Sequence, residues 1–170
     1  QAYARIQHAL TLTGGATAAE KAYIEALATR YAEQPPEDRS ALDRAYADAM
    51  RQLRTSYPDD LDAATLAAEA LMDLTPWNYW LSATEPRPET VEALELLEGV
   101  LARDPGHLGA NHYLIHAVEE YFPERAEPAA DRLGALAPDA GHLVHMPSHI
   151  YWRVGRYQDA MEINQRATEA

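Results

Sequence analysis

Four of the seven histidines form two pairs with the same spacing, H-x-x-x-H. His112 and His116 make the first pair, and His145 and His149 repeat it 33 residues later. On a helix, residues i and i+4 point to the same side and lie about 5–6 Å apart at Cβ, so each pair can chelate one metal ion. Two such pairs on neighbouring parallel helices would supply four nitrogen ligands. The spacing therefore predicts a transition-metal site.

Other residue types narrow the chemistry of this site. The chain contains no cysteine, so a metal ion has to be held by nitrogen and oxygen atoms. Neutral imidazole suits zinc, copper, nickel and iron, and the ligand types do not single out one of them. His142 and the carboxylates of Glu69 and Glu119 are further candidate ligands. We expect no such role for His8 and His107, because a single histidine on a helix is more often a packing or surface residue.

Two other interpretations of the paired histidines remain open. The side chains could contact a bound peptide or a partner helix instead of an ion. They could also form a pH-responsive cluster, since neighbouring imidazoles repel one another when they are protonated near pH 6.5.

Composition and charge limit the classes of partner. The chain has 170 residues, a formal net charge of −13 and a pI near 4.8. A nucleic-acid partner is not expected, because binding the phosphate backbone requires clustered Lys and Arg. The apolar runs are too short for a membrane span, and the absence of cysteine fits a cytoplasmic protein. The chain begins without Met and ends inside an amphipathic segment, so we expect a piece of a longer protein.

The elements that must position the histidines are helices. Ala, Leu and Glu dominate, and no segment shows the period-two alternation of a strand, so the sequence predicts an all-α protein. Thr17 and Glu20 have the spacing of a capping box, which predicts the start of a helix. Residues 1–57 are expected to form helical hairpins. Later helices are predicted at roughly 60–74, 88–103, 107–121, 124–136, 141–154 and 157–170.

A repeat pattern extends over residues 58–170. Pro105 and Pro138 are 33 residues apart and follow helical segments, and Gly155, Tyr157 and Ala160 follow in the next segment. With these residues the chain resembles the tetratricopeptide repeat, a helix-turn-helix unit of about 34 residues. The residues around the histidines are also similar to those of bacterial tetratricopeptide proteins of unassigned function. The resemblance implies three units, at about 58–105 with an inserted loop 75–88, at 106–138, and at 139–170, which is incomplete.

This resemblance implies a right-handed α-solenoid of antiparallel helix hairpins whose first helices line a concave face. In the family's register, His112 and His145 fall at the same inward-facing position, and His116 and His149 fall at another. His142 and Glu69 are also inward-facing in that register. The four paired histidines are therefore expected to face one another across two parallel helices, with Glu69 in the same row.

Three classes of function follow. The leading one is a solenoid that binds a transition metal through a histidine cluster on its concave face, with a catalytic role left open. The second is a scaffold that holds a peptide or protein in the concave groove without a metal. The third is a metal-dependent enzyme, an oxidoreductase or a hydrolase, with one open coordination position and Glu69, Glu119 or Asp73 as a nearby carboxylate. The sequence identifies no catalytic residue and no oligomeric state.

Overall fold

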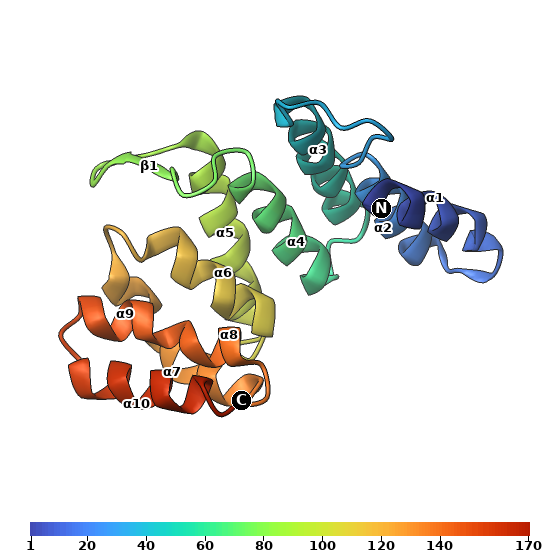
Figure 1. Cartoon of the computed structure of the whole chain (residues 1–170). Coiled ribbons are helices and arrows are strands. Elements are labelled where there is room, and N and C mark those ends of the chain that lie inside the picture. The colour runs from blue at the N-terminus through green and yellow to red at the C-terminus, as the bar shows by residue number, and fades with distance from the viewer. The chain divides into compact units, whose positions relative to one another are not determined.

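Apolar residues recur at helical spacing along nearly the whole chain, and the computed structural model, which describes residues 1–170, folds them into helices (Figure 1). The predicted all-α class is confirmed, with one short pair of strands as the exception. None of the helices is both long enough and apolar enough to traverse a bilayer. The chain divides into two compact units, Gln1–Asn78 and Tyr79–Ala170.

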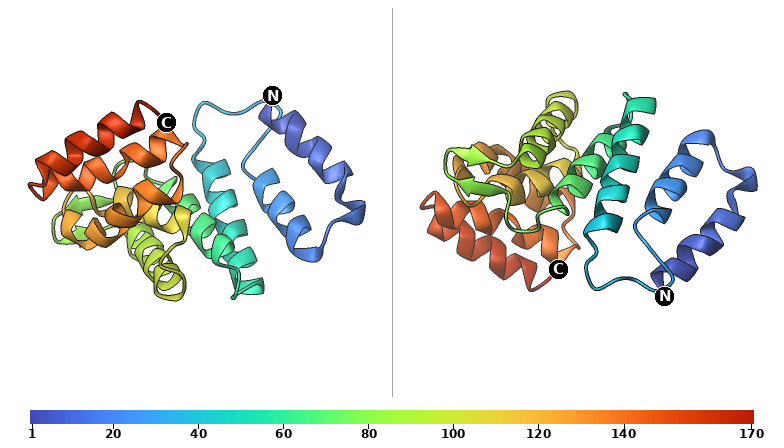
Figure 2. Two further views of the ribbon diagram at one scale, coloured as in Figure 1. Left: turned by 90° about the horizontal axis from the view of Figure 1, so that it is seen from below. Right: turned by 90° about the horizontal axis from the view of Figure 1, so that it is seen from above.

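The first unit is a series of helices in which each packs against the next. Its elements are α1 (Ala2–Thr11), the 3-10 helix η1 (Thr13–Gly15), α2 (Ala18–Ala28), α3 (Ser40–Ser56) and α4 (Leu61–Met72). The predicted capping box is confirmed at the start of α2. The Glu20 backbone N–H donates to Thr17 Oγ1 at 3.2 Å, and the Thr17 backbone N–H donates to Glu20 Oε2 at 2.7 Å. Figure 2 shows α3 and α4 running side by side.

The second unit carries most of the histidines. Its elements are β1 (Trp80–Ser82), β2 (Glu85–Pro86), α5 (Pro88–Arg103), α6 (Leu108–Val118), the 3-10 helix η2 (Pro123–Ala126), α7 (Glu127–Leu136), α8 (Gly141–His145), α9 (Pro147–Arg153) and α10 (Tyr157–Ala167). In this unit α6 packs against α5 and α7, α7 against α9, and α10 against both α8 and α9. The core between them includes the fully buried side chains of Leu97, Ile115, Leu133 and Ile150.

The helix predicted over 141–154 is divided at Pro147. Proline has no backbone N–H and its ring crowds the carbonyl four residues earlier, so the regular hydrogen-bond ladder is interrupted there. Met146 keeps helical backbone angles between α8 and α9. His149 donates its backbone N–H to the Met146 carbonyl, an i→i+3 bond, instead of to the His145 carbonyl. The break therefore lies between His145 and His149.

The predicted inserted loop 75–88 contains the antiparallel hairpin of β1 and β2. Trp80 is buried, and its indole Nε1–H donates to the Ala117 carbonyl at 2.7 Å. Its ring packs on Phe122, with the ring centroids 4.9 Å apart. The hairpin is thus fastened to the C-terminal end of α6. The boundary between the two units also falls in this loop, so the pairing of helices within an expected unit 58–105 stays a prediction.

Candidate metal centre

Helix α6 holds its histidines on the side opposite to its core face. Leu114, Ile115 and Val118 are buried, and His112 and His116 follow one another at i and i+4. His107 precedes the helix as its N-cap, with Nδ1 accepting the Ala110 backbone N–H at 3.2 Å. Because this donor would otherwise be unsatisfied, His107 stabilises the start of α6.

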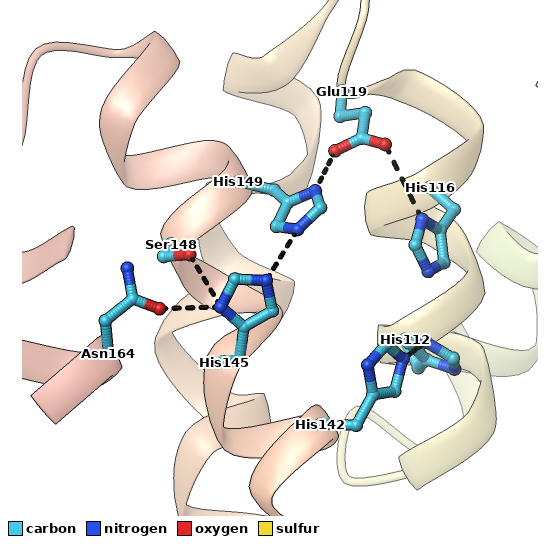
Figure 3. A network of polar contacts seen from close by, with 8 residues as sticks. All are labelled: His112, His116, Glu119, His142, His145, Ser148, His149 and Asn164. Carbon is cyan, nitrogen blue, oxygen red and sulfur yellow. Dashed lines mark hydrogen bonds and ion pairs between the residues drawn. The ribbon is translucent and has the colours of Figure 1, made fainter. Parts of the chain in front are cut away.

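The other histidines come from α8 and α9. Val144, Met146 and Ile150 are buried in the core and fix the orientation of these two short helices. His142, His145 and His149 therefore share the opposite side, at a spacing of three and then four residues. Figure 3 shows α6 next to α8 and α9, with all five histidines between them.

Three of the imidazoles form a compact group of candidate ligands. One nitrogen each of His112, His116 and His142 lies within 4.8 Å of the other two. His112 Nε2 and His142 Nε2 are 3.1 Å apart. Two nitrogens bound at about 2.0–2.1 Å to one tetrahedral ion would be about 3.3 Å apart, so this spacing is close to that of a coordinated pair. We refer to His112, His116 and His142 as the histidine triad.

Glu119 lies on the other side of the His116 ring. Its Oε1 is 3.5 Å from His116 Nδ1, and its Oε2 accepts the Nδ1–H of His149 at 2.5 Å. An ionised carboxylate can only accept hydrogen bonds, so it favours the tautomers in which both Nδ1 atoms carry the proton. The Nε2 atoms of His116 and His149 are then left with lone pairs. Glu119 is thus placed to orient these rings, and the sequence had offered it both as a direct ligand and as a nearby carboxylate.

His145 and His149 form a second group, which we call the histidine dyad. Their Nε2 atoms are 2.9 Å apart. His145 Nδ1 lies 2.6 Å from Asn164 Oδ1 on α10 and 3.4 Å from Ser148 Oγ, as Figure 3 shows. The two groups adjoin one another, because the ring centroids of His116 and His149 are 6.0 Å apart.

Burial keeps part of this cluster neutral. Burial lowers the pKa of His112 to about 4, and the adjacent His116 and His142 add to the effect. Burial also lowers the pKa of His142, with further contributions from His116 and His145. For Glu119, burial alone would favour the neutral form, but the hydrogen bonds from His116 and His149 outweigh it and lower the pKa to about 2. At neutral pH the cluster therefore contains uncharged imidazoles beside a carboxylate, and an imidazole must be uncharged to bind a metal.

The histidines that lie closest together in the structure are not the set that the sequence pairs. The sequence paired His112 and His116 with His145 and His149, whereas the closest three-nitrogen group contains His142, which was offered only as a supplementary ligand. Asn164 and Ser148 were not identified from the sequence at all. Asn164 contacts His145 because α10 packs on α8 and α9, a tertiary relationship that residue spacing does not carry. Ser148 lies on α9, three residues after His145, so its contact is local.

The remaining candidates lie in the first unit. Glu69 on α4 is 3.5 Å from Arg30 Nη1, and Asp73 pairs with the same guanidinium. Burial and the nearby Asp73 raise the pKa of Glu69 to about 7. His8 is exposed on α1. A role for Glu69 or Asp73 beside the histidines stays a prediction.

Comparisons with known proteins add nothing to this geometry. No family model, no curated protein and no solved structure matches the chain. The tetratricopeptide resemblance accordingly stays an expectation.

Proposed function

We propose that this protein binds a transition-metal ion through the histidine triad, His112, His116 and His142. The observation that carries the proposal is that three ligand nitrogens, contributed by the neighbouring helices α6 and α8, lie within 4.8 Å of one another. Rotation of the imidazoles about their side-chain bonds would bring them to one ion without moving either helix. Zinc, copper and iron all accept such a ligand set.

Electrostatics support a cation at this place. His112 and His142 have lowered pKa values, so little free energy is spent on removing protons before a metal binds. The ionised Glu119 compensates part of the added positive charge and holds the Nδ1 side of His116, as carboxylates commonly do behind a ligating histidine. The net charge of −13 also attracts cations.

The proposal includes a tetratricopeptide-like solenoid as the scaffold. The second unit supports it with helices that pack in series along the chain, α5 with α6, α6 with α7, and α9 with α10. Gly155 has a φ of +83° in the turn between α9 and α10, the place where the resemblance puts a turn glycine. Only glycine adopts this backbone conformation without strain. In such a solenoid an ion held by α6 and α8 would join two successive repeats.

A hydrolytic role is a second candidate, and the dyad with Glu119 favours it. Three protein ligands leave a fourth position for water, whose pKa a bound metal lowers. His149 lies next to His116 and is held by Glu119. If the His145 ring turned away from His149 Nε2, this nitrogen could take a proton while the carboxylate stabilises the resulting imidazolium. A metal-loaded His149→Gln variant should then lose ester hydrolysis while keeping its metal content. Equal hydrolysis rates would exclude this role.

The test of metal binding compares single histidine variants. Zinc affinity is measured by competition with a chromophoric chelator for the wild type and for His142→Ala, His145→Ala and His8→Ala. We expect His142→Ala to weaken binding most and His8→Ala to have no effect. If zinc affinity is lost in His145→Ala and retained in His142→Ala, the ion binds at the histidine dyad instead. Unchanged zinc affinity in both variants, or no zinc bound by the wild type, would refute metal binding. The remaining function would then be a scaffold that holds a peptide or protein without a metal.

A further inference from the structure

A cavity of about 450 Å³ opens between α9 and α10. Its apolar lining includes Trp152, Tyr157 and Met161, which are 63%, 65% and 57% exposed. These side chains come from two helices that pack against each other, so they are gathered into one place by the fold. A volume in this range is typical of small-molecule sites, which combine apolar walls with a few polar groups.

One arginine side chain lies at this cavity. Arg153 lines it and lies over the Trp152 ring, with Cζ 6.0 Å from the ring centroid. Arg156, three residues further on, pairs with Asp131 and Asp159, but Arg153 pairs with no carboxylate of the chain. In a protein with a net charge of −13, an arginine without an acidic partner is the group most complementary to an anion from outside.

The polar side of the cavity is made by Ser148, His149 and Asn164. These are the residues that bond to His145, as Figure 3 shows, so the cavity borders directly on the histidine dyad. A bound molecule would thus touch aromatic side chains on one side and imidazole and amide groups on the other. Both ring nitrogens of His149 are engaged, by Glu119 and by His145, so the Asn164 amide nitrogen and the Ser148 hydroxyl are the groups suited to a second, uncharged polar group of a ligand.

We infer that this cavity binds a small aromatic carboxylate. The ring would lie against Trp152, Tyr157 and Met161, where burial of apolar surface favours it. The carboxylate would accept hydrogen bonds from the guanidinium of Arg153, which presents its donors in a planar fork that matches two carboxylate oxygens. This inference concerns α9 and α10 alone and does not require a metal ion.

The test uses 3-phenylpropanoate as the probe and 3-phenylpropanamide as its uncharged counterpart, with binding measured by isothermal titration calorimetry in the presence of EDTA. We expect saturable binding of the acid and at least about tenfold weaker binding of the amide. Arg153→Gln should reduce the affinity for the acid to that for the amide. Trp152→Ala should weaken both probes, because it removes the aromatic wall.

Two matched variants serve as controls. Arg54→Gln changes an exposed arginine on α3, and Trp77→Ala removes a tryptophan that is 69% exposed outside the cavity. Both should bind the acid like the wild type. Absence of saturable binding, equal affinity for acid and amide, or equal losses in the control variants would each overturn the inference. Because EDTA is present throughout, absence of carboxylate binding would not contradict metal binding by the histidine triad. Likewise, absence of zinc binding would not contradict carboxylate binding in the cavity.

Discussion

Glu119 and His149 are 30 residues apart in the sequence, yet Glu119 Oε2 lies 2.5 Å from His149 Nδ1, and this contact ties the C-terminal end of α6 to α9. The same carboxylate faces His116 Nδ1 through its other oxygen. One side chain thus bridges the histidine triad and the histidine dyad.

Glu119→Gln should weaken metal binding without removing a ligand. The amide is uncharged, so it no longer compensates the charge of the ion, and it holds the Nδ1–H of His116 less strongly. Loss of such an outer partner typically costs about 10- to 100-fold in metal affinity. The measurement is a zinc competition titration, with stoichiometry read by elemental analysis. Glu120→Gln, at the exposed neighbouring position, is the control and should bind zinc normally. A complete loss of zinc in Glu119→Gln would instead identify Glu119 as a direct ligand.

Zinc should raise the melting temperature of the protein. An ion held jointly by α6 and α8 binds the folded chain only, and at a free concentration 100 times its dissociation constant it stabilises that state by about 2.7 kcal/mol. This corresponds to a rise of several degrees. A thermal denaturation series with zinc and with EDTA measures the effect, and His142→Ala should show almost none of it. An unchanged melting curve in the wild type would contradict a structural ion.

The outcome for the individual residues shows which part of this site the sequence could reveal. The capping box at Thr17 and the helical spacing of His112 and His116 are local, so they could be predicted from residue types alone. Whether His142 or the histidine dyad lies nearest to His112 and His116 could not be predicted, because it depends on how α8 is placed against α6. His149 contacts Glu119, which is 30 residues away in the sequence, and His145 contacts Asn164, which is 19 residues away. Spacing places the histidines on one side of a helix but does not identify their tertiary partners.

Acid should destabilise the metal-free protein through His112. Its pKa is about 4 in the folded chain and 6.5 ordinarily, so between these values the unfolded chain binds more protons. The free energy of unfolding should therefore fall as the pH drops from about 6.5 to about 4. Glu119 adds a further loss below pH 4.5, since its pKa is lowered to about 2. Urea denaturation in EDTA at several pH values measures this. His112→Gln should show a shallower decline, whereas His8→Gln should follow the wild type, and parallel curves for all three would contradict the assignment.

Trp80→Phe should destabilise the second unit although the substituted ring is also aromatic. The indole N–H satisfies the Ala117 carbonyl near the end of α6, where helix carbonyls lack partners within the helix. Phenylalanine cannot donate, so a buried carbonyl is left unsatisfied at a cost of about 1–3 kcal/mol. Trp80→Ala also loses the packing on Phe122 and should cost about 3–5 kcal/mol. Trp77→Ala, at an exposed position in the same loop, should change stability little. Chemical denaturation followed by circular dichroism measures all three.

Because Glu119 follows Ala117 at the same end of α6, Trp80→Phe should also weaken zinc binding. Normal zinc affinity in this variant would show that the hairpin does not hold the metal site in place.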